Sequence, residues 1–276
     1  MARIRAVATD LDGTLLRTDK LIHPDDIATA KLLRQKGVRL FIATGRHPAL
    51  TRWYAEALGG VDLAITANGA QLCNFAGGRT VEEHFLTGPQ AAQVKEFAAA
   101  QGAEYFVYTR DFPCYLRQDK RVQPDNHGFV MGKGPDFGDV MRIMDEVPDA
   151  LDYPVVKVIF PDLDRARIPE LQRRFGDCSL EIYDYDRIVA EIGPAGCSKG
   201  AALGTAARLY GFDLSEALVL GDNYNDLSML RVAGYPVAPQ NGYPEARQAA
   251  VYLCADNDPA PRPDAIRHFQ PDLLEP

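Results

Sequence analysis

Two aspartates stand one residue apart near the start of the chain, in the stretch AVATDLDGTLL. Asp10 and Asp12 follow an apolar run that is typical of a buried strand, and Gly13 comes next. Alternate residues of a strand point to the same side, so both carboxylates would face one region. Such a pair suits a hard divalent cation, or a reaction in which one carboxylate attacks and the other moves protons. A helix cap or a turn after the strand is the alternative.

Two further clusters have the composition of an anion site. Thr44, Gly45 and Arg46 follow a second apolar run and precede a predicted helix, so the hydroxyl and the backbone N–H groups could cradle an anion. An ordinary turn has the same composition. Lys199 lies in the first turn of another predicted helix, where its charge opposes the helix dipole unless an anion is bound there. A solvated lysine that points away is the alternative.

The fourth cluster is LGDNYNDL, in which Asp222, Asn225 and Asp226 follow the apolar run ALVL. These residue types also favour surface turns, so each cluster is ambiguous by itself. The four clusters together are a more specific signal than any one of them. Two acid pairs and a hydroxyl each follow a predicted strand, and a lysine lies at the start of a predicted helix. Together they predict an acidic metal pocket flanked by phosphate-binding groups, in which a carboxylate nucleophile fits because phosphoryl transfer depends mainly on positioning and charge neutralisation.

The elements that must position these clusters alternate between strand and helix at both ends of the chain. Strands are predicted at residues 4–10, 38–45, 61–69, 217–222 and 235–238. Helices are predicted at residues 24–37, 47–60, 197–211 and 225–234. This alternation predicts a doubly wound, parallel, Rossmann-like α/β sheet, and sites in such sheets form beyond the carboxyl ends of the strands.

The middle of the chain has a mixed pattern that predicts an inserted α+β domain. Strands are expected at residues 104–109, 153–160, 178–183 and 187–192, helices at 88–102 and 163–176, and a loop at 124–138. The last two strands resemble a hairpin. We therefore expect a catalytic core of residues 1–82 and 191–276, with a cap domain of residues 83–190 inserted into it.

Composition limits the classes of partner. The chain of 276 residues carries 38 acidic and 30 basic side chains, a net charge of −8, which argues against nucleic acid or an anionic membrane as the main partner. No apolar run approaches the length of about 20 residues that a membrane span needs, and the early charges argue against a signal peptide. Five scattered cysteines predict reduced thiols in a cytoplasmic protein. The histidines lack metal-ligand spacing. His23 and His47 could line the entrance of the site, and solvated loop residues are the preferred interpretation.

With these motifs in place, the sequence resembles the haloacid dehalogenase-like (HAD) superfamily of phosphohydrolases. The segments DLDGTLL, TGR, NGA, SKG and GDNYND match its successive motifs in order. The long insertion between NGA and SKG is similar to the large α/β cap of the Cof-type subfamily. The resemblance implies a HAD core with an inserted cap, and an enzyme that hydrolyses a phosphoric monoester with Mg²⁺ as cofactor.

The resemblance also implies roles for the acids. Asp10 would attack phosphorus and form an aspartyl-phosphate. Asp12 would protonate the leaving oxygen and later deprotonate the attacking water, and we expect an adjacent acid and partial desolvation to favour its protonated form. The carboxylates of Asp10 and Asp222 and the main-chain carbonyl of Asp12 would hold Mg²⁺, with Asp226 supporting them from behind.

Phosphate binding is implied for a second set of residues. These are Gly13, Thr44, Gly45, Lys199 and Asn225, while Arg46 and Asn68 are candidates for contact with the rest of the substrate. The chain departs from the family pattern at Pro239-Gln240 and at residues 259–265. Neither change touches a carboxylate, so both bear on the loops beside the substrate and not on catalysis.

The motif set is specific for the family and not for a substrate. The expected function is hydrolysis of a small phosphorylated metabolite, such as a sugar phosphate. Two alternatives remain, a phosphomutase of the same superfamily and a non-hydrolytic phosphate-sensing module. The sequence leaves the oligomeric state open.

Overall fold

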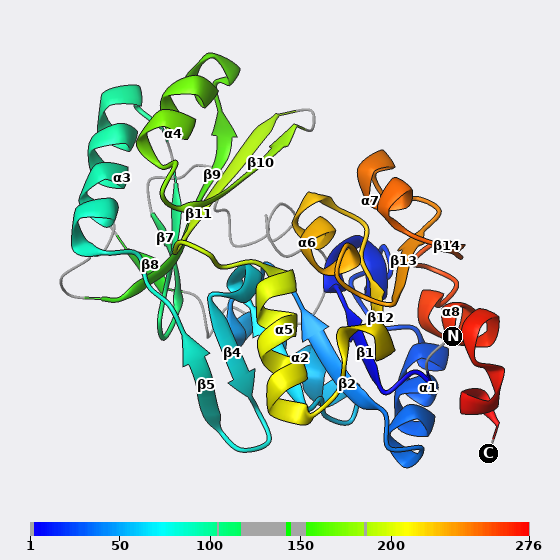
Figure 1. Cartoon of the computed structure of the whole chain (residues 1–276). Helices are drawn as coiled ribbons and strands as arrows, with labels where there is room; N and C mark the ends of the chain where they lie inside the picture. Colours follow the sequence, from blue (N-terminus) through cyan, green and yellow to red (C-terminus); the bar gives the residue numbers. More distant parts are fainter. Residues whose placement is uncertain (1–2, 104, 117–141, 145–152, 185–186, 276) are drawn as a thin grey trace. The chain divides into compact units, whose positions relative to one another are not determined.

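The computed structural model describes residues 3–103, 105–116, 142–144, 153–184 and 187–275. Internal contacts divide them into two units (Figure 1). The first unit runs to Glu82 and resumes at Ser198, and the second lies between Glu83 and Cys197. The loop expected at 124–138 lies outside the described residues. Within the described ranges, no helix has the length and apolar character that a bilayer crossing requires.

The first unit contains an eight-stranded sheet in the order β14-β13-β12-β1-β2-β3-β4-β5. The strands are β1 (Ala6–Thr9), β2 (Arg39–Ala43), β3 (Leu63–Thr66), β4 (Gln71–Asn74), β5 (Arg79–Glu83), β12 (Ala217–Leu220), β13 (Tyr235–Pro239) and β14 (Tyr252–Cys254). From β14 to β3 all neighbours are parallel, and β4 pairs antiparallel to β3. Thr9 at the end of β1 pairs with Leu220 and Ile42, so three carboxyl ends meet there. The predicted parallel sheet is confirmed.

Strand order reverses direction at β1, and this reversal places helices on both faces of the sheet. The helices of the first unit are α1 (Pro24–Gln35), α2 (Pro48–Ala57), α5 (Lys199–Tyr210), α6 (Leu227–Leu230), α7 (Pro244–Ala249) and α8 (Pro261–Phe269). Crossover connections are right-handed, so α1 and α2, which lead from β1 to β3, cover one face, and α6 and α7, which lead from β12 to β14, cover the other. Ala202, Leu203 and Met229 of this second face pack on Ala8 and Val219 of the sheet. Ligands bind at such a switch point in α/β sheets.

Two histidines start helices, contrary to the sequence-based interpretation. His23 Nδ1 accepts the N–H of Asp25 at 3.1 Å, and His47 Nδ1 accepts the N–H of Ala49 at 3.1 Å. Each is followed by a proline at the first helical position, which has no N–H to satisfy. His47 is buried, so its interpretation as a solvated loop residue was wrong.

The helix predicted at 225–234 is shorter in the structure, because a 3₁₀ turn occupies Tyr224–Asp226 before α6.

The second unit contains a six-stranded sheet in the order β10-β11-β9-β6-β7-β8. Its strands are β6 (Phe106–Thr109), β7 (Pro113–Leu116), β8 (Arg142–Met144), β9 (Val155–Leu163), β10 (Ser179–Asp184) and β11 (Ile188–Gly193), and its helices are α3 (Gly88–Gln101) and α4 (Ile168–Arg174). One sheet face packs on these helices, with Phe97 and Phe160 in edge contact at 5.5 Å between ring centroids. β10 and β11 pair antiparallel, which confirms the predicted hairpin. An α+β domain is therefore inserted into the α/β core.

Candidate active site

A wide turn after β1 brings the first acid pair to the sheet edge. Asp10 continues the ladder by donating its N–H to the Leu220 carbonyl at 2.9 Å. The chain then makes two hydrogen bonds that span five residues, from Leu15 N–H to Asp10 O and from Leu16 N–H to Leu11 O. Gly13 has φ +76°, and a Cβ there would lie 2.3 Å from Asp222 Oδ2. Glycine is required at this position because a side chain would occupy the space of the Asp222 carboxylate.

The acids after β12 are held by short-range hydrogen bonds. Asp222 Oδ1 accepts the hydroxyl of Thr14 at 2.7 Å, which ties this loop to the turn after β1. Asp226 Oδ2 accepts the backbone N–H groups of Asp222 and Asn223, both at 3.0 Å. Asp226 is fully buried and Asp222 nearly so. The two carboxylates are therefore fixed in place before any ligand binds.

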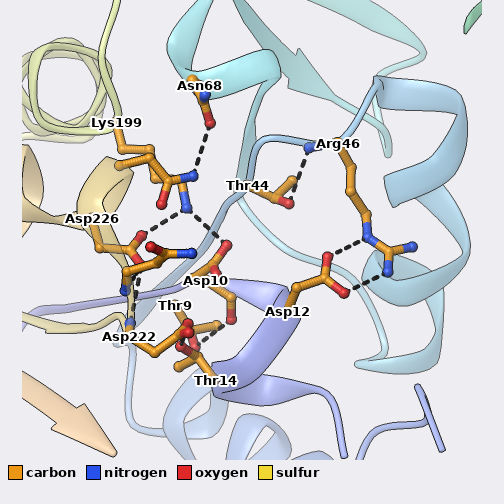
Figure 2. A network of polar contacts seen from close by, with 12 residues as sticks. Thr9, Asp10, Asp12, Thr14, Thr44, Arg46, Asn68, Lys199, Asp222 and Asp226 are labelled. Carbon is orange, nitrogen blue, oxygen red and sulfur yellow. Dashed lines mark hydrogen bonds and ion pairs between the residues drawn. The ribbon is translucent and has the colours of Figure 1, made fainter. Parts of the chain in front are cut away.

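Lys199 connects the two acid clusters. It is the first residue of α5, whose N-cap Ser198 accepts the N–H of Ala201. The side chain is completely buried, and its Nζ donates to Asp10 Oδ1 at 2.8 Å and to Asp226 Oδ1 at 2.7 Å (Figure 2). The alternative of a solvated lysine is therefore wrong. Residues from three distant segments meet around one ammonium group.

Burial and repulsion between carboxylates shift Asp10 and Asp222 towards their neutral forms. Burial raises the pKa of Asp10 to about 7, with Lys199 opposing this rise and the Asp226 and Asp12 charges adding to it. Burial and the neighbouring Asp10 carboxylate also raise the pKa of Asp222. For Lys199, burial acts to lower the pKa, but Asp10 and Asp226 outweigh it and raise the pKa. One ammonium group is thus shared among three buried carboxylates.

This donor set fits a hard divalent cation. Asp10, Asp222 and Asp226 each offer a carboxylate oxygen, and these atoms lie within 4.8 Å of one another. Carboxylate oxygens are the preferred ligands of Mg²⁺, and a small cation would balance the negative charge that Lys199 leaves uncompensated. The lack of a side chain on Gly13 lets the Asp222 carboxylate approach the turn that carries Asp10. These features support a metal site at the carboxyl ends of β1 and β12.

The raised pKa values predict how stability depends on pH. A carboxyl group with a raised pKa in the folded state stabilises the protein at low pH, and this contribution is lost as the pH rises through the folded pKa, here about 7 for Asp10. We expect the Tm of the protein in EDTA to fall between about pH 5 and about pH 8, and Mg²⁺ to raise the Tm more at the higher pH because it replaces the protons. Thermal unfolding measured by circular dichroism tests this. An equal effect of Mg²⁺ at both pH values would contradict it.

Asp12 lies apart from this cluster and is held as a charged group. Arg46 donates Nε to Asp12 Oδ2 at 2.6 Å and Nη2 to Oδ1 at 2.7 Å, and Lys20 Nζ donates to Oδ1 at 3.0 Å. Figure 2 shows Arg46 pointing to Asp12, while Asp10 faces Lys199. Burial acts to raise the pKa of Asp12, but the charges and hydrogen bonds of Arg46 and Lys20 together lower it. The expectation of a favoured protonated form is therefore wrong for this state, because it did not include the two cations.

The candidate phosphate-binding residues line the same edge. Thr44 follows β2, is buried, and its Oγ1 accepts the N–H of Arg46 at 3.2 Å. Asn225 donates Nδ2 to Asn68 Oδ1 at 3.2 Å, and the buried Oδ1 of Asn225 has no hydrogen-bond partner. Asn68 itself has φ +56° in a tight turn after β3. Gly45 follows Thr44 directly in the same loop. All of the predicted site residues therefore lie in the loops that follow β1, β2, β3 and β12 or at the start of α5.

Sequence reasoning missed two residues at this edge. Thr14, which fixes Asp222, is part of the DLDGT segment and was identifiable as a hydroxyl next to the acids. Lys20 carries no signal in the sequence, because nothing local indicates that its ammonium group reaches Asp12. Arg46 was considered for substrate contact, and in the structure its contacts include Asp12 and the ring of Tyr54, 5.1 Å from the guanidinium carbon.

Comparisons with known proteins show the family of the chain. A family model described as haloacid dehalogenase-like hydrolase matches residues 7–260. The pyridoxal phosphate phosphatase YbhA of Escherichia coli K12 is 27% identical over 265 residues, covering 92% of this chain and 94% of that protein. The 5-amino-6-(5-phospho-D-ribitylamino)uracil phosphatase YcsE of Bacillus subtilis 168 is 25% identical over 274 residues, covering 96% of each chain.

A solved structure supports the same fold. The HAD subclass IIB sugar phosphatase BT4131 superposes with a TM-score of 0.80 at 23% identity, covering 96% of this chain and 98% of that one. The family match spans both segments of the α/β core and the inserted α+β domain. Together with the acids around Lys199, it leads to one conclusion: the chain belongs to the haloacid dehalogenase-like hydrolases, among their Cof-type phosphatases.

Proposed function

We propose that the chain is a Mg²⁺-dependent phosphatase that hydrolyses a small phosphorylated metabolite, such as a sugar phosphate, through an aspartyl-phosphate on Asp10. The observation that carries the proposal is the buried ammonium group of Lys199 between Asp10 and Asp226, with Asp222 beside them. A nucleophilic carboxylate close to a phosphate dianion needs such compensation, because like charges would otherwise repel. Asp10, Asp222 and the main-chain carbonyl of Asp12 would hold the metal, which would neutralise charge on the phosphate.

The reaction divides into two proton-coupled steps. In the first, Asp10 forms a bond to phosphorus while the bond from phosphorus to the leaving oxygen breaks. Asp12, which is ionised in the structure, takes up a proton from the solvent or from a substrate monoanion before this step and gives it to the leaving oxygen. In the second, water attacks the phosphorus of the aspartyl-phosphate while the bond from phosphorus to the Asp10 oxygen breaks. Asp12 takes the proton of the water, and inorganic phosphate and the free Asp10 carboxylate result. Lys199 neutralises charge on Asp10 and the phosphate, while Thr44, the Gly45 N–H and Asn225 orient the phosphate oxygens. Enhancements of up to about 10²¹-fold are needed for phosphate-monoester hydrolysis, which favours a covalent route with full electrostatic support.

The class of substrate is supported by the proteins that resemble this chain. Pyridoxal phosphate and 5-amino-6-(5-phospho-D-ribitylamino)uracil, the substrates in the names of two of them, are small phosphorylated metabolites. We also propose a cytoplasmic location, which the five scattered cysteines without CxxC spacing favour.

The test is phosphate release from a panel of phosphorylated metabolites, with Mg²⁺ and with excess EDTA. Release from a subset of sugar or polyol phosphates that requires Mg²⁺ is the expected result. Activation by a sugar bisphosphate with little release of inorganic phosphate would identify a phosphomutase instead. Stable phosphate on Asp10 without turnover would identify a sensing module.

A further inference from the structure

A short hairpin next to the active site carries Lys20. Leu16 and Ile22 form a bridge at its base, and Arg17 N–H donates to Leu21 O at 2.9 Å. Lys20 closes the tip by donating its N–H to Arg17 O at 2.8 Å, and its φ of +62° is a left-handed conformation that lysine rarely adopts. The cost of this conformation, about 1 kcal/mol or more, indicates that the surrounding contacts favour it.

The hairpin is attached to the end of the domain by side chains far away in sequence. Asp258 accepts the N–H of Thr18 at 2.8 Å and its hydroxyl at 2.9 Å. Asn257 donates Nδ2 to Leu16 O at 2.7 Å and accepts Nδ2 of Asn241 at 2.8 Å. Asn257 and Asp258 therefore hold the hairpin against the C-terminal part of the domain.

The hairpin completes the hydrogen bonding of Asp12. Arg46 approaches Asp12 with two N–H groups from the start of α2, and Lys20 adds a third donor from the hairpin. The Asp12 side chain is 40% exposed, so packing alone does not fix its rotamer. Two cations on separate loops can fix it, since a bidentate arginine sets the plane of the carboxylate and a further donor limits its rotation.

We propose that Lys20 is a positioning residue for Asp12 and that Asp258 acts through Lys20 by anchoring the hairpin. The proposal rests on the proposed function, in which Asp12 exchanges protons with the leaving group and with water. Lys20 touches Asp12 and not the acids around Lys199 in the described contacts, so its effect is expected on the chemical step and not on the metal.

The first test compares Lys20→Met and Lys20→Arg with the wild-type enzyme on the best substrate of the panel. For Lys20→Met we expect kcat to fall about tenfold or more with KM within about twofold, because proton transfer by a positioned group contributes about 10²- to 10⁴-fold. Lys20→Arg keeps a donor and should recover most of kcat. The Tm and the Mg²⁺ concentration for half-maximal activity should stay unchanged in both. Lys31→Met, which removes an exposed charge from α1, is the matched control.

The second test is a double-mutant cycle with Asp258→Ala, with the exposed neighbour Asp256→Ala as its control. Asp258→Ala should lower kcat in the same way as Lys20→Met but less, and the double variant should be no slower than Lys20→Met alone. Additive losses would overturn the anchoring role. An unchanged kcat in Lys20→Met would overturn the positioning role. A raised KM at constant kcat would also overturn it and would indicate that Lys20 binds the substrate directly. A wild-type enzyme without Mg²⁺-dependent phosphate release would refute the proposed function itself, which distinguishes the two failures.

Discussion

We expect Asp10→Asn to reduce phosphate release by about 10⁴-fold or more, because Asp10 is the proposed nucleophile and the loss of a covalent nucleophile costs at least that much in comparable enzymes. The amide has nearly the same shape as the carboxylate but does not attack phosphorus. The fold should be retained, since the amide oxygen still accepts the hydrogen bond that Asp10 receives from Lys199 at 2.8 Å. Replacing a buried carboxylate whose pKa is raised to about 7 also removes repulsion among the acids.

The measurement is phosphate release with Mg²⁺ at saturating substrate, together with the Tm of the variant in EDTA. Asp272→Asn, an exposed aspartate near the C-terminus, provides a control for the chemical change alone. The expected pair of results is a nearly inactive enzyme whose Tm in EDTA at about pH 8 is equal to or above that of the wild type. Activity within about tenfold of the wild type would show that Asp10 is not the nucleophile.

Lys199→Met will affect both catalysis and stability. One preorganised charge on the reacting groups is worth about 10²- to 10³-fold in kcat, so we expect a loss of this size. Lys199 is completely buried between Asp10 and Asp226, and removal of one partner of a buried ionic group typically lowers the free energy of unfolding by about 3–5 kcal/mol. Methionine fills similar volume, so the loss reflects charge and hydrogen bonds and not a cavity.

The stability effect of Lys199→Met should depend on pH. At about pH 5 the Asp10 carboxyl, with its raised pKa, is protonated and loses little when the ammonium group is removed, whereas at about pH 8 it must carry an uncompensated charge. Urea unfolding in EDTA at both pH values measures the difference, and Lys31→Met on the surface of α1 is the matched control. A loss of unfolding free energy that is the same at both pH values would contradict the assigned network.

The residues of the site could be predicted from the sequence because they follow buried strands directly. In parallel sheets the carboxyl ends of neighbouring strands meet, so Asp10, Thr44 and Asp222 converge whenever β1, β2 and β12 pair in parallel. Lys199 was predictable for a similar reason, since a lysine in the first turn of a helix opposes the dipole unless an anion faces it. Apolar runs and helix starts are encoded in short stretches of sequence. The strands and the helix that carry these residues could therefore be predicted.

Contacts between loops were decided only by the tertiary structure. The sequence did not indicate that Lys20 and Arg46 would both reach Asp12, and their charges reversed the expected direction of its pKa shift. It also gave no sign that Asp258 would hold the hairpin that carries Lys20. Short stretches of sequence encode the periodicity of apolar residues and the helix caps. Contacts between two irregular loops depend instead on where the whole sheet places those loops. The sequence by itself thus determined which groups gather at the sheet edge, and the folded chain determined how Asp12 is held there.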